Sequence, residues 1–257
     1  MPVKDATQRF SSRVDNYVRY RPGYPREVVQ LLRDECGLSA ESVVADIAFG
    51  TGIFTQMLLE NGNRVFGVEP NEDMRRAGEQ LLANYPQFTS IAGTAEATTL
   101  PDRSMDLVTA AQAAHWFDPE KARREFVRIL KPDGWLALLW NDRRLDSTEF
   151  LRQYEQLLRT YGTDYEDVRQ RGMTLALEGF FPQLFQTREF EYKQTFDYAG
   201  LEGRLLSSSY VPQKDHPNYE AMLRELRRIF DAHQVNGKVS FDYDTRVHYG
   251  QLGNLKT

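Results

Sequence analysis

Apolar positions in the first 141 residues follow two alternating patterns. Short continuous apolar runs, such as SVVADIAFG (42–50) and WLALLWN (135–141), are typical of strands that are buried on both faces. Between such runs, apolar residues recur three and four positions apart, as in REVVQLLRDEC (26–36) and PEKARREFVRIL (119–130), which predicts amphipathic helices. Strands and helices that alternate with short connections predict a mostly parallel sheet covered by helices on both faces.

Local signals place further elements in this half. We expect strands at Val65–Glu69 and Leu107–Ala111 and a weaker strand within FTSIAGTAE (88–96). Asn71 stands where a helix-capping residue is expected, and KPDG (131–134) is predicted to be a turn.

The second half has a different pattern. Residues 147–180 and 198–231 appear helical, whereas FQTREFEYKQTFDY (185–198) favours a strand. In KVSFDYDTRVHYG (238–250) apolar and polar residues alternate, which is the period of a half-buried strand. We expect these two strands to pair antiparallel at one edge of the sheet, and the helices to form a cap over the strand ends.

Composition excludes several classes of protein. The 257 residues are 41% hydrophobic and 27% charged, which is typical of a folded globular chain. A net charge of −5 argues against a nucleic-acid partner. The N-terminal MPVKDATQRF has no apolar core, and the longest apolar run, WLALLW (135–140), is too short to span a bilayer, so we expect no membrane association and a cytoplasmic protein. The single cysteine, Cys36, excludes a disulfide framework and is expected to be a buried, inert thiol, and the four scattered histidines predict no metal site.

The segment DIAFGTG (46–52) carries the clearest candidate chemistry. A phosphate-binding P-loop would need a lysine after Gly52, and none is present. A dinucleotide fingerprint fails at Ala48 and Ile53. An acid followed by glycines at alternate positions fits better, because only Ala48 departs from that pattern.

This pattern resembles motif I of the class I S-adenosylmethionine-dependent methyltransferases, which have a Rossmann-like α/β fold. Glu69 follows Asp46 by 23 positions, where the resemblance implies an acid that binds the ribose hydroxyls. GTAEATTLPDRSMDLVTAAQAAHWF (93–117) and RILKPDGWLALL (128–139) resemble the adenine loop and the approach to the fifth strand of that family. FSSRVDNYVRYRPGYP (10–25) and HWFD (115–118) are similar to the methyltransferase type 11 group, among which trans-aconitate methyltransferase and its relatives act on small molecules.

The resemblance implies roles for individual residues. The expected contacts to S-adenosylmethionine are Tyr20, Arg21, Asp46, Ala48, Gly50, Thr51, Gly52, Glu69, Pro70, Met74, Thr94, Ala95, Glu96, Ala111 and Gln112. His115 and Trp116 are the catalytic candidates, and the substrate contacts are expected to be Tyr17, Asn141, Arg143 and Tyr210.

Alternatives remain for several of these residues. Arg21 either pairs with the methionine carboxylate of the cofactor or belongs to an ordinary exposed loop, and His115 either accepts a proton or packs under the cap. Arg143 and its neighbour Arg144 suit a carboxylate substrate, but an exposed arginine pair is also a common solvated surface. A left-handed backbone at Ala48 would cost roughly 1–2 kcal/mol, so we expect weakened or unchanged cofactor binding.

Together these features predict a single methyltransferase domain over residues 1–257. We expect a cofactor-covering segment (1–25), a cofactor-binding core (26–141), a mainly helical cap (142–236) with one sheet strand near 184–197, and a final edge strand (237–250). The expected activity is methyl transfer to a small molecule, with a carboxylate as one candidate and without a metal. The alternatives are a non-catalytic cofactor-binding or sensor domain and a nicotinamide oxidoreductase, and the pattern does not indicate an oligomeric state.

Overall fold

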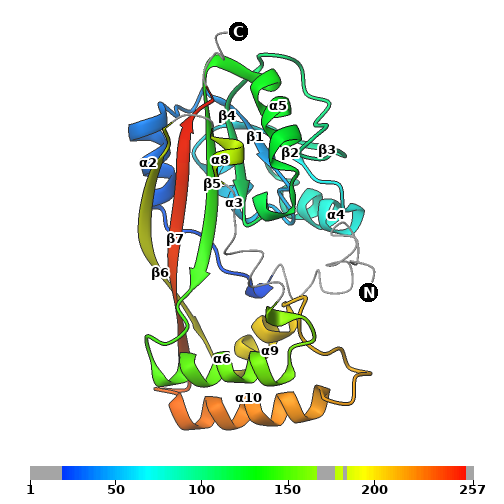
Figure 1. Ribbon diagram of the computed structural model, residues 1–257, viewed down its shortest axis with the longest axis vertical. Coiled ribbons are helices and arrows are strands. Elements are labelled where there is room, and N and C mark those ends of the chain that lie inside the picture. Colours follow the sequence, from blue (N-terminus) through cyan, green and yellow to red (C-terminus); the bar gives the residue numbers. More distant parts are fainter. Residues whose placement is uncertain (1–18, 167–176, 182–183, 253–257) are drawn as a thin grey trace.

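The computed structural model describes residues 19–166, 177–181 and 184–252. Within these residues, seven strands form one sheet in the order β3-β2-β1-β4-β5-β7-β6 (Figure 1). The strands are β1 (Val43–Ile47), β2 (Arg64–Val68), β3 (Phe88–Ile91), β4 (Met105–Ala111), β5 (Leu130–Arg143), β6 (Gln186–Phe196) and β7 (Val239–Gln251).

Strands β1 to β5 are parallel, and β7 runs antiparallel to both β5 and β6. The predicted mostly parallel sheet with an antiparallel edge is therefore confirmed. In β7 the buried residues alternate with partly exposed ones from Val239 to Tyr249, as the sequence pattern predicts. The second strand begins and ends one residue earlier than expected, which leaves Glu69 just beyond its carboxyl end.

The prediction of a turn at residues 131–134 is wrong, because these residues lie within β5. Pairing between β4 and β5 is irregular there: Met105 pairs with Leu130, whereas Leu107 pairs with Trp135. The proline and glycine of KPDG therefore mark a bulge in a continuous strand rather than its start.

Helices cover both faces of the parallel part of the sheet. They are α2 (Glu27–Cys36), α3 (Ile53–Glu60), α4 (Glu72–Leu81) and α5 (Pro119–Ile129), with a 3₁₀ turn, η3 (Ala114–Trp116), before α5. The predicted cap is confirmed, because the Asn71 side chain accepts a hydrogen bond of 2.9 Å from the Met74 N–H. Cys36 is buried in α2, and burial raises the pKa of its thiol to about 12.

The hydrophobic core has one layer on each face of the sheet and a third in the cap. In β5, Leu136, Leu138 and Trp140 pack on the side of α5, whereas Ala137 and Leu139 pack on the side of α2 and α3. Burial of both faces explains why this strand reads as a continuous apolar run.

The third layer belongs to helices that gather at one end of the long strands β5, β6 and β7 (Figure 1). These helices are α6 (Glu149–Tyr161), α9 (Tyr198–Leu206) and α10 (Tyr219–His233). Their buried side chains, such as Leu151 and Leu226, pack against Phe241 of β7. The expected helical cap is therefore present.

The helices of the cap are shorter than the sequence pattern predicts. Helix α6 ends at Tyr161, and residues 207–218 between α9 and α10 form no helix. Part of the predicted stretch 147–180 lies outside the described residues. The short helix α8 (Leu177–Phe180) packs against α5, where Gly179 lies beside Pro119, and not with the cap helices (Figure 1).

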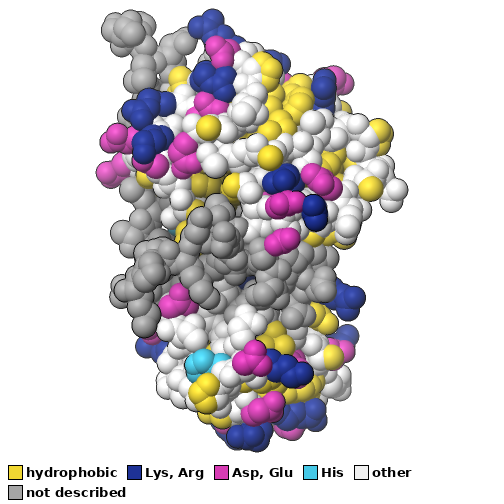
Figure 2. Space-filling view, turned by 90° about the vertical axis from the view of Figure 1, so that its right-hand side faces the viewer, with side chains coloured by type: hydrophobic (Ala, Val, Ile, Leu, Met, Phe, Trp, Pro, Cys, Tyr) yellow, Lys and Arg dark blue, Asp and Glu magenta, His cyan; other side chains and the backbone are white. Residues whose placement is uncertain are grey.

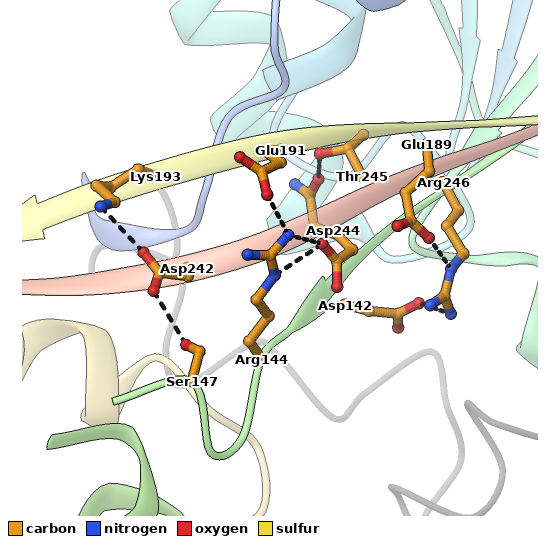
Figure 3. A network of polar contacts seen from close by, with 11 residues as sticks. Asp142, Arg144, Ser147, Glu189, Glu191, Lys193, Asp242, Asp244, Thr245 and Arg246 are labelled. Carbon is orange, nitrogen blue, oxygen red and sulfur yellow. Dashed lines mark hydrogen bonds and ion pairs between the residues drawn. The ribbon is translucent and has the colours of Figure 1, made fainter. Parts of the chain in front are cut away.

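Alternating charges connect β5, β6 and β7 on their polar face (Figure 3). Arg246 lies 2.9 Å from Asp142 and 2.8 Å from Glu189, and Arg144 lies 2.6 Å from both Asp244 and Glu191. A network of this kind stabilises strand pairing more than isolated surface ion pairs do.

Charges of both signs are also intermixed over the face seen in Figure 2. Within the described ranges, no helix is both long and apolar enough to cross a bilayer. The same residues contain no group of three His, Cys, Asp or Glu side chains that could hold a metal ion.

Candidate cofactor and substrate site

A cavity of about 660 Å³ opens where the glycine turn after β1 faces the cap. Its walls come from the carboxyl ends of β1, β4 and β5, from residues near Arg21 and from cap residues such as Arg204. In open parallel sheets, ligands bind at the carboxyl ends of the strands, so this cavity lies where the fold predicts a site.

The glycine turn has an unusual backbone. Ala48, Gly50 and Gly52 all have positive φ angles, of 55°, 61° and 89°. The Gly52 N–H closes the turn with a hydrogen bond of 2.9 Å to the Phe49 carbonyl. Ala48 therefore adopts the left-handed conformation that costs an alanine roughly 1–2 kcal/mol, and its N–H is held by the Val68 carbonyl at 2.7 Å.

The groups around this turn suit a polar ligand such as the adenosyl and methionine parts of the expected cofactor. Thr51 is 2% exposed and lines the cavity, yet its hydroxyl has no hydrogen-bond partner among the described residues. Gly50 also lines the cavity, and a Cβ there would meet the Met74 methyl group at 3.3 Å. A ligand oxygen or amino group would satisfy the Thr51 hydroxyl.

Two buried acids connect the turn to the neighbouring strands. Asp46, which is 1% exposed, accepts hydrogen bonds from the hydroxyls of Thr55 (2.6 Å) and Thr109 (2.8 Å). Burial raises the pKa of Asp46 to about 6, although the two hydroxyls oppose the shift. Glu69 accepts the Gly50 N–H at 3.0 Å and the Asn71 N–H at 2.8 Å, and its pKa is also raised, mainly by burial.

The structure brings most of the predicted site residues to the cavity. Its lining includes Arg21, Asp46, Ala48, Gly50, Thr51, Ala111, Gln112, His115, Trp116, Asn141, Arg143 and Tyr210.

The remaining candidates do not line the cavity. Gly52 is the N-cap of α3, Met74 packs behind the turn, and Glu69 contacts the turn through the Gly50 N–H. The others are Tyr20, Pro70, Thr94, Ala95 and Glu96. Tyr20 packs against Gly203 of α9, and Glu96 accepts a hydrogen bond of 3.0 Å from the Asp118 N–H. Tyr17 lies outside the described residues.

Aromatic rings form one wall of the cavity. The His115 ring lies 4.7 Å from the Trp116 ring and 6.3 Å from the Trp140 ring, measured between centroids. The His115 imidazole therefore borders the cavity beside two indole rings.

Asn141 ties the N-terminal segment to the sheet. Its amide nitrogen donates to the Gly23 carbonyl at 2.8 Å, and its amide oxygen accepts the Thr245 hydroxyl at 2.6 Å. The side chain predicted to contact substrate is thus engaged by the protein at both ends.

Several cavity residues are absent from the sequence-based list. They are Trp140, Tyr165, Arg204, Tyr243, Arg246 and His248, among others. One of them had a visible signal: Arg204 lies between Leu201 and Leu205 in LEGRLL, so a charge falls on the apolar face of a helix. Arg144, by contrast, is held by Asp244 and Glu191 and does not line the cavity.

Comparison with known proteins agrees with this geometry. A family model described as a methyltransferase domain matches residues 45–138. An uncharacterized methyltransferase-like protein of Schizosaccharomyces pombe is 33% identical over 92% of this chain and 92% of its own length. An uncharacterized methyltransferase of Mycobacterium tuberculosis is 39% identical, in an alignment that spans 65% of this chain and 65% of that relative.

A solved structure from Anaeromyxobacter dehalogenans, assigned as a type II methyltransferase, superposes with a TM-score of 0.68. It covers 91% of this chain and 99% of its own, and at 22% identity it shows the likeness of the fold. The chain therefore belongs to the class I S-adenosylmethionine-dependent methyltransferases of the type 11 group, a family whose cofactor is S-adenosylmethionine.

Proposed function

We propose that this protein transfers the methyl group of S-adenosylmethionine to a small molecule, and that small carboxylic acids are the first class to test. The observation that carries the proposal is a single cavity that joins the glycine turn to polar residues of the cap. One space thus has room for a cofactor beside β1 and for an acceptor beneath the cap.

At the β1 end, the chain's own groups would hold the cofactor. Thr51 and Gly50 line the cavity, and Glu69, which lies behind Gly50, would accept the ribose hydroxyls while it keeps the Gly50 N–H. A carboxylate has about four acceptor positions, so two backbone N–H groups do not exhaust it. The other predicted cofactor contacts belong to this proposal as well.

S-adenosylmethionine supplies a methyl group that is already activated on a sulfonium. The protein therefore has to align the acceptor and to exclude water. Trp116 and Trp140 would form an apolar wall, and His115 would take a proton from an acceptor hydroxyl or amine. A carboxylate acceptor would need no such base.

Further parts of the proposal concern the whole chain. We propose that residues 1–257 act as one domain and that Tyr17 and Arg21 help to cover the cavity. We also propose a cytoplasmic location, which is supported by the lone, buried Cys36.

Calorimetric titration tests the function directly. The protein should bind S-adenosylmethionine and S-adenosylhomocysteine with micromolar affinity, whereas NAD should not bind. A radiolabelled methyl group should then move to at least one member of a panel of small acids, alcohols and amines. A folded sample that binds neither sulfur compound would refute the proposal.

A further inference from the structure

Arg204 is a buried cation that no carboxylate neutralises among the described residues. It is 6% exposed and lines the cavity from the cap helix α9. Its hydrogen bonds go to three hydroxyls: Tyr243 at 3.4 Å, Ser208 at 3.2 Å and Ser207 at 3.5 Å. An arginine does not lose its proton in a protein, so its charge persists in this setting.

A second guanidinium, Arg143 at the end of β5, lines the same cavity. Its Nη2 lies 2.6 Å from Glu155, but its buried Nη1 has no hydrogen-bond partner among the described residues. Glu155 is shared, because it also accepts hydrogen bonds from Tyr165 at 2.6 Å and Arg159 at 3.1 Å. One carboxylate thus serves several donors, and Arg143 keeps an unused N–H group.

Among the described residues, the balance of charge at this end of the cavity is positive. There Arg143 and Arg204 together carry two charges against the single charge of Glu155. The two acids that line the cavity are engaged elsewhere: Asp46 with two threonine hydroxyls and Asp142 with Arg246. A buried charge without a counter-ion is costly, so an anion that enters here gains a strong interaction.

The electrostatics of Tyr210 agree with this balance. Tyr210 also lines the cavity, and its pKa lies below the usual value. Burial raises that pKa, but the charges of Arg204, Arg21 and Arg143 and a hydrogen bond from Ser208 outweigh it. The lowered pKa of the Tyr210 hydroxyl therefore indicates a positive electrostatic potential in the space that a ligand would occupy.

We propose that Arg204, Arg143 and Tyr210 form a subsite that binds a carboxylate group of the substrate. The forked guanidinium of Arg204 suits the two oxygens of a carboxylate, and the phenol rings of Tyr210 and Tyr243 would border the rest of the acid. That the bound acid is the substrate rests on the proposed function, whereas the ability to bind a carboxylate depends on these side chains alone. The subsite recognises the charge of the acid, whichever atom accepts the methyl group.

The test uses two acids and their neutral counterparts, benzoate with benzamide and succinate with succinamide. Each is titrated calorimetrically into the full-length protein at millimolar concentration, with and without S-adenosylhomocysteine. At least one acid should bind while its amide does not. Arg204→Met should weaken that binding by about tenfold or more, the typical value of hydrogen bonds to a charged group, while S-adenosylhomocysteine binding stays unchanged.

Arg152→Met is the matched control, because Arg152 lies on the exposed side of α6, where it pairs with Glu149. This variant should bind the acid as the wild type does. Failure of both acids to bind the folded wild-type protein would overturn the subsite, as would equal binding by Arg204→Met.

A second measurement covers the case in which Arg204→Met does not fold. The tyrosinate absorbance of the wild type minus that of Tyr210→Phe gives the pKa of this one phenol. A bound carboxylate should raise it, because the anion offsets the charges of Arg204, Arg143 and Arg21. The other ionisable groups near this cluster, Glu155 and the phenols of Tyr154, Tyr165 and Tyr243, are present in both proteins.

An acid that binds without moving the Tyr210 pKa would bind elsewhere and would refute the subsite. The two proposals also fail separately. Absence of S-adenosylhomocysteine binding with intact acid binding refutes the methyltransferase function alone, and the reverse result refutes the subsite alone.

Discussion

The backbone N–H of Gly50 donates a hydrogen bond of 3.0 Å to the Glu69 carboxylate. This contact joins the turn after β1 to the acid after β2, so the two motifs that are 19 residues apart form one structural unit. Because the second carboxylate oxygen accepts the Asn71 N–H, the orientation of Glu69 is fixed before any ligand arrives.

Glu69→Gln should weaken binding of S-adenosylhomocysteine by about tenfold or more, because a charged acceptor is replaced by a neutral group with one acceptor oxygen. Calorimetry measures the change. Glu72→Gln is the control, since Glu72 is exposed in the next helix and forms an ion pair with Arg76 there. Equal affinity of the Glu69 variant and the wild type would remove Glu69 from the cofactor site.

Ala48→Gly should leave the protein as stable or stabilise it by up to about 1 kcal/mol. The left-handed backbone costs alanine roughly 1–2 kcal/mol, and the greater freedom of glycine in the unfolded chain offsets part of the gain. Cofactor affinity should stay equal or rise by less than about tenfold. Chemical denaturation and calorimetry measure these two quantities.

The matched variant is Gly50→Ala, at a φ of 61° close to the 55° of Ala48. It should destabilise the protein, since the new methyl group also meets Met74 at 3.3 Å. If Ala48→Gly restores tight binding to a protein that binds nothing, the alternative of a domain that has lost its cofactor gains support.

Asp46 should make the folded protein less stable as the pH rises, which is the opposite of the usual effect of a carboxyl group. The pKa of Asp46 is about 6 in the folded protein against 3.8 for an ordinary aspartate, so the folded state binds the proton more tightly than the unfolded state. This contribution is fully favourable below 3.8 and is lost as the pH rises to about 6. Relative to Asp46→Asn, the wild type should lose on the order of 3 kcal/mol across that window.

Denaturant unfolding of both proteins at several pH values measures this difference. Asp118→Asn supplies a control with the opposite sign, because a hydrogen bond and ion pair with Lys121 lower the pKa of Asp118. The wild type should lose stability relative to that variant as the pH falls. A pH-independent difference for Asp46→Asn would mean that the pKa of this carboxyl is the same in the folded and unfolded states.

Asn141→Leu should loosen the N-terminal segment near Gly23, although Gln194 of β6 still donates to the Tyr20 carbonyl at 3.3 Å. It leaves the Gly23 carbonyl and the Thr245 hydroxyl without their present partner, which should cost about 1–3 kcal/mol. Hydrogen exchange near Gly23 should become faster. Thr245→Val removes only the second contact, so it should destabilise the protein without this local effect, and fast exchange in both variants would contradict the role given to Asn141.

The sequence predicts the sheet well because each strand carries its own pattern. The continuous apolar run of β5 and the alternation of β7 follow directly from burial on two faces and on one face. The ends of elements are harder to predict. KPDG has the chemistry of a turn, but only the pairing with β4 shows that the chain continues there as a strand.

The site residues also differ in how well the sequence predicts them. Gly50 and Glu69 belong to motifs that can be read locally, whereas Arg204 gains its meaning from Arg143 and Tyr210, which lie on other elements. The non-helical residues 207–218 include Pro212 and Pro217, which disfavour a helix although the spacing of apolar residues predicts one there.

The length of the long strands sets the distance between the parallel part of the sheet and the cap helices. Strands β5 and β7, of 14 and 13 residues, run from the parallel part of the sheet to the cap helices (Figure 1). Each residue adds about 3.3 Å to a strand. Two extra residues in both strands would therefore move the cap helices about 7 Å farther from the parallel part of the sheet and keep every side chain on its present face. A single extra residue would turn these faces over unless a bulge absorbed it, as the bulge at residues 131–134 does in β5.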